Sequence, residues 1–254
     1  MTEITTSRQG QTLVISFNRP EKMNAITRSM YAGLAQNLNE AAGDFGIRCV
    51  VITSEGDHFT SGNDIRDFMS NPPTESDSDV AKFLGALLEF PKPLLAAVKG
   101  NAIGVGTTML LHCDVVVASP TASFSMPFTS LGLVPEAGSS MLFPNLVGYQ
   151  RAAKVFMTGE SFGAAEAKEM GLVATVADDA FAEAISIAEK IAAQPPQAII
   201  NTKALIKASK HDAVAAVMKA EFELFALALT SDEAMEAFMN FIAKKAAEKE
   251  KGGK

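Results

Sequence analysis

The feature that most constrains this fold is a glycine-rich turn between two short apolar runs, within residues 93–140. Residues 94–98 have the length of a buried strand, and 115–117 form a second β-branched run. The loop that follows the first run and leads into an apolar helix start is crowded by three glycines, Gly100, Gly104 and Gly106. Such a layout leaves backbone N–H groups free at a helix N-terminus, where they stabilise a bound anion or an oxyanion that forms during a reaction.

The composition is that of an ordinary globular protein, with 254 residues of which 48% are hydrophobic and 20% charged. A formal net charge of −7 argues against a nucleic-acid or anionic-membrane surface, because phosphate binding needs a concentrated basic face. No apolar run is long enough to span a membrane, and residues 1–10 lack the apolar core of a signal peptide. We therefore expect a cytoplasmic protein without nucleic-acid or membrane partners.

Strand signals fill the first half of the chain and helix signals the second. Residues 12–17 alternate, which predicts a strand with one apolar face, and 49–52 form a β-branched strand. Beyond Gln197 apolar residues recur at helical spacing, as in Val214, Val217, Met218, Phe222, Phe225 and Leu229. This change predicts an α/β core in residues 1–196 and a helical C-terminal region in 197–254 that packs on the core or on a neighbouring subunit.

Five segments, in this order, carry a family resemblance: FNRPEKMNAIT (17–27), HFTSGNDI (58–65), PKPLLAAVKGNAIGVG (91–106), CDVVVASPTASFSMPFTSLGLVPEAGSS (113–140) and TGESFGAAEAKEMGLVATV (158–176). Together they resemble the crotonase, or enoyl-CoA hydratase/isomerase, superfamily. The resemblance implies a crotonase-like spiral of ββα units, a helical trimerisation region, a homotrimer or dimer of trimers, and acyl-CoA thioester substrates. Nothing in the sequence suggests a metal or redox cofactor. We expect none, and the coenzyme A is counted as part of the substrate.

The resemblance also implies an oxyanion hole made of two backbone N–H groups. By position these belong to Asn63, in the SGND turn, and Val105, in the GVG turn. Two fixed donors in a dry pocket stabilise the enolate that forms when a thioester loses its α-proton. Read without the resemblance, these glycine turns are equally compatible with tight turns alone. Further substrate or CoA contacts are expected from Ser61, Asp64, Gly104 and Phe128.

The identity of the catalytic acid separates the reactions of the superfamily. The resemblance implies that hydratases use two glutamates to hold and split a water, and the matching positions here are Thr108 and Phe128. Neither side chain serves as an acid or base near neutral pH. Ordinary hydratase activity is therefore not expected.

Glu136 follows Pro135, at the position where the resemblance places the single catalytic glutamate of Δ3,Δ2-enoyl-CoA isomerases. One carboxylate suffices to move a proton from C2 to C4, and apolar neighbours such as Phe128 and Phe143 should raise its pKa. From local sequence alone Glu136 is also compatible with a surface acid at a helix N-terminus. The alternatives to an isomerase are a hydratase, a hydrolase, a ring-substrate isomerase, or an acyl-CoA-binding protein without catalysis.

The remaining polar candidates are interpreted as structural. His58, His112 and His211 lie far apart in the sequence, and Cys49 and Cys113 are expected to be buried reduced thiols. Three lysines share one helix face, which predicts a solvated surface with contact to CoA phosphates as the alternative: Lys203, Lys207 and Lys210.

Overall fold

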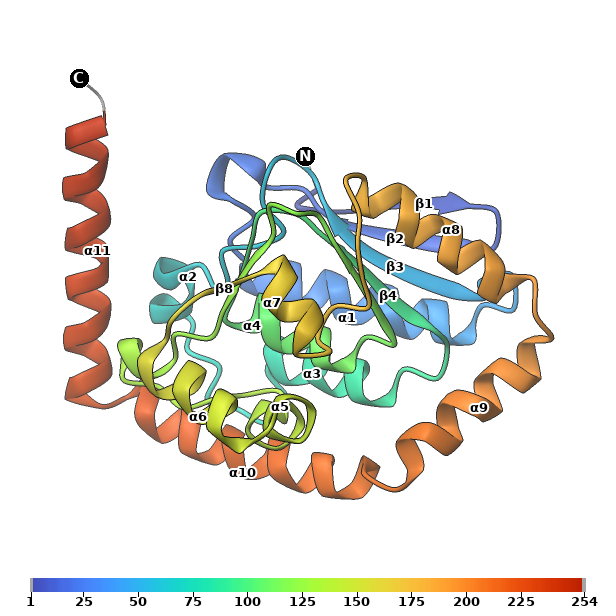
Figure 1. The fold of residues 1–254 in the computed structure, drawn as a ribbon. Helices are drawn as coiled ribbons and strands as arrows, with labels where there is room; N and C mark the ends of the chain where they lie inside the picture. Colours follow the sequence, from blue (N-terminus) through green and yellow to red (C-terminus); the bar gives the residue numbers. More distant parts are fainter. Residues whose placement is uncertain (1, 253–254) are drawn as a thin grey trace.

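The computed structural model describes residues 2–252, which form two sheets wrapped by helices (Figure 1). The larger sheet has the strand order β1-β2-β3-β4-β6-β9 and is parallel except for the β1–β2 hairpin. In the smaller sheet, β5-β7-β8, the first pair is parallel and the second antiparallel. The strands are β1 Ile4–Gln9, β2 Thr12–Phe17, β3 Cys49–Ser54, β4 Leu94–Val98, β5 Asn101–Ile103, β6 Val115–Ala118, β7 Ser123–Ser125, β8 Phe162–Gly163 and β9 Thr175–Val176.

Helices cover both faces of the larger sheet and continue around the body. Short 3-10 turns occur at η1 Pro20–Lys22, η2 Met109–His112 and η3 Thr129–Leu131. The α-helices are α1 Arg28–Gly43, α2 Ile65–Ser70, α3 Asp79–Glu89, α4 Val105–Thr108, α5 Ser139–Val147, α6 Tyr149–Thr158, α7 Ala164–Glu169, α8 Ala180–Ala192, α9 Pro196–Ala208, α10 His211–Leu229 and α11 Asp232–Gly252. Among the described residues, none of these helices is both long and apolar enough to cross a membrane.

The chain spirals between the two sheets. It passes from β4 in the larger sheet to β5 in the smaller one, and again from β6 to β7. The segment after β3 also passes from the larger sheet to the smaller one. Its Thr60 forms an isolated parallel bridge with Ala102 of β5. This α/β spiral with a helical C-terminal region confirms the predicted fold class.

Strand β2 has the apolar face that its alternation predicts, and its opposite face is buried as well. Leu13 and Ile15 pack in the main core with α1, whereas Val14 packs on the opposite face with α8. All six residues of β2 are buried, because β2 is an interior strand that has helices above and below it.

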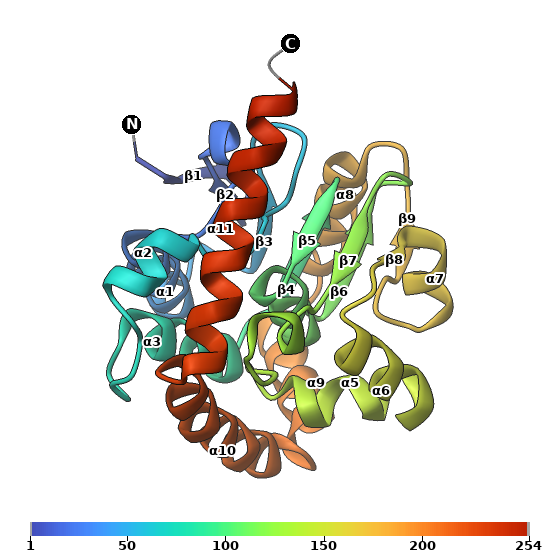
Figure 2. The same cartoon turned by 90° about the vertical axis from the view of Figure 1, so that its left-hand side faces the viewer.

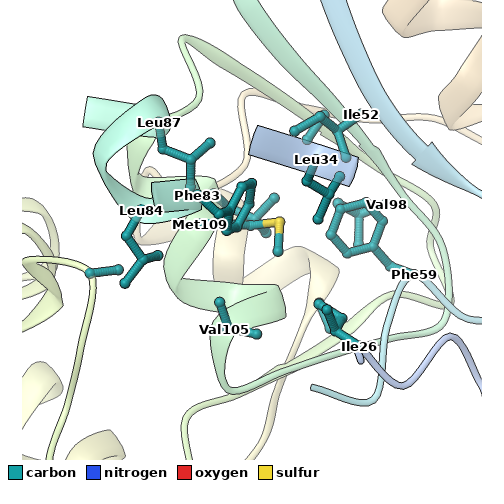
Figure 3. Packing of buried hydrophobic residues seen from close by; sticks show 14 of the residues in the cluster. Ile26, Leu34, Ile52, Phe59, Phe83, Leu84, Leu87, Val98, Val105 and Met109 are labelled. Atoms are coloured by element: carbon teal, nitrogen blue, oxygen red, sulfur yellow. The ribbon is translucent and has the colours of Figure 1, made fainter. Parts of the chain in front are cut away.

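The main core supports the glycine turn from below. Figure 3 shows Leu34 of α1, Phe83 and Leu87 of α3, and Met109 gathered around one centre, with Val105 at the edge of the same cluster. Helix α1 begins at Arg28 as predicted, since Thr27 accepts a hydrogen bond from the amide of Met30. The turn therefore rests on a packed floor rather than on a mobile loop.

Helices α9 and α10 run along one side of the body, and α11 rises from the end of α10 (Figures 1 and 2). The start of α11 packs closely on η3, because a Cβ on Gly132 would lie 2.9 Å from the Cα of Ala234. Ala234 and Phe238 are buried in the main core. Helices α9 to α11 together cover residues 196–252.

Lys203 lies buried under α9, so the interpretation of its helix face as solvated was wrong at this position. Its ammonium group donates to the Asp114 carboxylate and to the carbonyl of Lys92, both at 2.7 Å. Asp114 in turn accepts from the amide of Leu94, which ties α9 to two strands of the larger sheet. Lys207 also donates to a core element, through the carbonyl of Leu88.

We expect Lys203→Met to lower the free energy of unfolding by about 2–3 kcal/mol, because it leaves the Asp114 carboxylate without its cation in a partly buried site. Urea denaturation followed by circular dichroism measures this loss. Lys210→Met, an equal change in the turn between α9 and α10, is the matched control. A Lys203 variant as stable as wild type would contradict the anchoring role.

Candidate active site

The two glycine turns lie side by side although about 40 residues separate them. The amide of Thr60 donates to the carbonyl of Asn101, and the amide of Ile103 donates back to the carbonyl of Thr60. Glycine is required where they meet, because a Cβ on Gly62 would lie 2.8 Å from the carbonyl oxygen of Ile103. A Cβ on Gly106 would lie 2.4 Å from the Thr60 methyl group. The second sheet thus brings the SGND and GVG turns together.

Asn24, from the NAI part of the first motif, holds the loop that leads into this turn. Its side-chain amide donates to the carbonyls of Glu55 and His58, and its own carbonyl accepts the Thr60 hydroxyl. Asn24 has a φ of 54°, a left-handed conformation that asparagine tolerates better than most residues. The first motif therefore has a structural role, because its Asn24 fixes the loop that leads into the SGND turn.

Two amides at the junction are free to bind a ligand. Ile26 pairs with Asn63 in a parallel bridge and bonds to Gly62 and Asp64 on either side of it, so the N–H of Asn63 itself points away from Ile26. Val105 begins α4, where the first N–H groups have no partner within the helix. Within residues 2–252, neither the Asn63 nor the Val105 amide donates to a protein acceptor.

Glu136 reaches the helix that follows the GVG turn. Its carboxylate accepts the hydroxyl of Thr108, the last residue of α4. Burial raises the pKa of Glu136 to about 8; the Thr108 hydrogen bond works against this rise, and the negative charge of Glu221 adds to it. The direction of this shift is the one that the sequence predicts for a desolvated acid. Such a group is a far stronger base than an exposed glutamate.

Tyr31, which the sequence did not single out, binds the first turn and lies near the acid. Its hydroxyl donates to the side-chain oxygen of Asn63. The pKa of Tyr31 lies well above its ordinary value, mainly because the residue is buried and also because the Glu136 charge is near. The available signal was a hydroxyl group within the apolar stripe of α1, between Met30 and Leu34.

Comparison with known proteins agrees with this geometry. The family model described as enoyl-CoA hydratase/isomerase matches residues 7–251. The chain belongs to the enoyl-CoA hydratase/isomerase family. Among solved structures it resembles OdaA from Pseudomonas aeruginosa, with a TM-score of 0.93 and 40% identity over 95% of this chain and 99% of that one. An enoyl-CoA hydratase/isomerase from Pseudoalteromonas atlantica gives 0.91 and 42%, over 96% and 98% of the two chains.

The curated relatives include both isomerases and hydratases. Human enoyl-CoA delta isomerase 2 is 35% identical over 96% of this chain, which spans 64% of the human protein's length. The 2,3-dehydroadipyl-CoA hydratase of Escherichia coli is 34% identical over 96% of this chain and 97% of its own. The chain is therefore an enzyme of the enoyl-CoA hydratase/isomerase family. The choice between isomerase and hydratase rests on the site.

The four positions predicted to contact substrate or CoA differ in how free they are to bind a ligand. Gly104 has a φ of 58° and open space where a Cβ would stand, so it borders the free Val105 amide without obstruction. Asp64 is already engaged: it binds Arg19 at 2.7 Å and caps the N-terminus of α2. Ser61 is partly exposed beside the SGND turn and Phe128 is buried. Contact with CoA stays a prediction for these four residues.

Glu221, on α10, is a second buried acid near Glu136 that the sequence analysis also missed. Its carboxylate accepts the amides of Gly138 and Ser140, at 2.6 and 2.8 Å. Glu221 therefore occupies the N-terminal end of α5, the role that local sequence offered for Glu136. The signal was a glutamate at the spacing of the apolar stripe, four residues before Phe225 and three after Met218.

Thr108→Val should lower kcat by about tenfold, because it removes the hydrogen bond that orients Glu136 while keeping the volume of the side chain. The same change removes a bond that opposes the raised pKa, so the pKa of Glu136 should rise further. Steady-state kinetics across pH measure both effects, and Thr108→Ser, which retains a hydroxyl, is the control. Equal kcat in the valine variant and wild type would exclude this role.

Proposed function

We propose that this enzyme is a Δ3,Δ2-enoyl-CoA isomerase, which shifts a 3-enoyl-CoA double bond into conjugation with the thioester to give 2-trans-enoyl-CoA. The observation that carries the proposal is one carboxylate, Glu136, linked through Thr108 to the helix of the Val105 turn and electrostatically through Tyr31 to Asn63. The thioester oxygen would accept the free amides of Asn63 and Val105, which stabilise the dienolate. Glu136 would remove the proton from C2 and return it to C4.

One carboxylate is sufficient for both proton transfers of this reaction. The dienolate spreads its charge between C2 and C4, so one carboxylate can serve both carbons in turn without a second acid. Hydration instead needs groups that hold and split a water, and the positions where the family resemblance places them carry Thr108 and Phe128. Phe128 is buried and apolar. These residues favour isomerisation over hydration.

The test is product identification with a panel of acyl-CoA thioesters. With a trans-3-enoyl-CoA the proposal predicts a rise in absorbance from the conjugated 2-enoyl thioester, without 3-hydroxyacyl-CoA. With a 2-enoyl-CoA it predicts negligible hydration. Fast hydration would instead favour a hydratase, in line with the Escherichia coli relative. Tight binding without turnover across the panel would favour an acyl-CoA-binding role.

The kcat/KM for isomerisation should rise with pH and level off near pH 8. Glu136 must be ionised to accept the C2 proton, and its raised pKa of about 8 leaves it mostly protonated at neutral pH. Below that value kcat/KM should fall about tenfold per pH unit. Rates measured from pH 6 to 9 with substrate well below KM give this profile, and a flat profile over that range would contradict Glu136 as the base.

We further propose that the enzyme works as a homotrimer or dimer of trimers and needs no cofactor besides the coenzyme A of its substrate. Supporting the first point, large apolar side chains lie exposed along the C-terminal helices: Leu205, Ile206, Leu224, Leu227, Met235 and Met239. Supporting the second, proton transfer by Glu136 and charge stabilisation by two amides account for each step of the reaction. The division into a core of residues 1–196 and a helical region of 197–254 remains part of this proposal.

A further inference from the structure

The turn that carries Glu136 has an unfavourable backbone conformation. Ala137 has a φ of 61° and Gly138 a φ of 71°, two successive left-handed residues. Alanine in this region costs on the order of 1 kcal/mol and persists only where the surroundings impose it. Glu136 therefore depends on neighbours that hold this turn in place.

Two buried side chains hold it from opposite sides. His112 bonds through Nε2 to the carbonyl of Ala137 at 2.7 Å, and burial lowers the pKa of His112 to about 4. The imidazole is thus neutral at physiological pH, and the Nε2–H tautomer makes it the donor. From α10, Glu221 accepts the amides of Gly138 and Ser140. The carbonyl and the amides of the turn are fixed independently.

The hydrogen bonds of Glu221 favour its ionised form. Its two oxygens accept the backbone N–H groups of Gly138 and Ser140, and the Ser140 side chain bonds to the carboxylate as well. These bonds lower the pKa of Glu221, whereas burial, the larger influence, raises it above the ordinary value. Amides at a helix N-terminus favour the charged form of a carboxylate. Glu221 is 6% exposed, so solvent screens its charge only weakly.

We propose that Glu221 is a positioning residue for Glu136: its carboxylate fixes the turn of residues 137–140 in its left-handed conformation, and its negative charge disfavours a second negative charge on Glu136 and so makes Glu136 a stronger base. This inference rests on the proposed function, in which Glu136 is the base. It adds to that function a residue 85 positions away in the sequence, on a helix of the C-terminal region.

The other groups around Glu136 cannot supply the same effect. Tyr31 faces it from α1 but is neutral, since its pKa is raised well above the ordinary value. Thr108 faces it from α4 and carries no charge, and its hydrogen bond lowers the pKa of Glu136. Among the charged groups of the part of the chain that the structure describes, Glu221 is the one that raises the pKa of Glu136.

The test compares Glu221→Gln with Glu223→Gln, an equal change of charge at an exposed position two residues along the same helix. A glutamine offers one acceptor for two amides, so Glu221→Gln should lower kcat about 10- to 100-fold with KM within about twofold of wild type. It should also move the acid limb of the kcat/KM profile to lower pH. The Glu223 variant should change neither.

A readout without turnover separates this inference from the proposed function. Carboxyl 13C NMR of glutamate-labelled protein, with the Glu136 signal assigned from Glu136→Gln, gives the titration midpoint of Glu136 directly. The midpoint should fall in Glu221→Gln and stay in Glu223→Gln. If wild type fails to isomerise 3-enoyl-CoA, the function is wrong but this titration still decides whether Glu221 acts on Glu136.

Glu221→Asp keeps the charge but withdraws the carboxylate by one methylene, and it serves where the glutamine variant loses its fold by circular dichroism. Here kcat should fall while the Glu136 midpoint stays closer to wild type than in Glu221→Gln. A wild-type kcat and an unchanged midpoint in a folded Glu221 variant would overturn the proposal. So would equal shifts in the Glu223 control.

Discussion

Glu136→Gln is expected to lower kcat for 3-enoyl-CoA isomerisation by about 10³-fold, within the range for loss of a general base. Glutamine keeps the size of the side chain and can still accept the Thr108 hydroxyl, but it cannot take a proton from C2. KM should change little, because the two amides of Asn63 and Val105 remain to hold the thioester. Steady-state kinetics with trans-3-enoyl-CoA, monitored by absorbance, measure the loss.

Stability measurements show whether the lost activity reflects chemistry rather than unfolding. A carboxylate whose pKa is raised to about 8 by burial destabilises the folded protein wherever it must ionise, so Glu136→Gln should raise Tm most at and above pH 8. Glu166→Gln, the same change on an exposed helix position, should alter neither Tm nor kcat. Near wild-type turnover in the Glu136 variant would remove this residue from the mechanism.

Gly62→Ala is expected to lower kcat by about 10²-fold, close to the effect of removing one donor from an oxyanion hole. The new methyl group would stand 2.8 Å from the Ile103 carbonyl and would push the Asn63 turn away from the Val105 turn. Gly62 also has a φ of +82°, so alanine there should cost about 1–3 kcal/mol of stability. Kinetics and urea denaturation separate the two effects.

Gly10→Ala is the matched control for the glycine variant. Gly10 has a φ of +58° but nothing within 4 Å of its missing Cβ, so alanine adds backbone strain without a collision. It should lose stability and keep its kcat. If both variants lost stability equally while Gly62→Ala retained wild-type kcat, the two amides would not form the oxyanion hole.

Much of the fold could be predicted from local patterns. The helix from Thr27 and the strands at residues 49–52, 94–98 and 115–117 follow from periodicity, composition and capping, and the structure has them at these places. Solvent exposure was harder to predict, because it depends on what covers each face. Strand β2 lies between two layers of helices, and Lys203 is buried against Asp114 through contacts about 90 residues apart.

For the candidate site, the sequence pointed to the glycine turns and Glu136, and it did so through short motifs that resemble the family. Local sequence alone left the glycines compatible with tight turns and Glu136 compatible with a surface acid. Tyr31 and Glu221 enter the site from helices α1 and α10, which the fold brings to the turns from distant parts of the chain. A polar residue inside an apolar helical stripe was the one local sign of each, and such a sign does not name its partner.

Proton tracing in D2O tests whether one carboxylate shuttles a proton from C2 to C4. A single turnover of trans-3-enoyl-CoA by excess enzyme is quenched, and the deuterium at C4 of the product is measured by mass spectrometry or NMR. Transfer by Glu136 should give 2-enoyl-CoA with part of the original hydrogen retained at C4. A 3-hydroxyacyl-CoA product, or a C4 hydrogen that comes entirely from solvent at the earliest times, would contradict it.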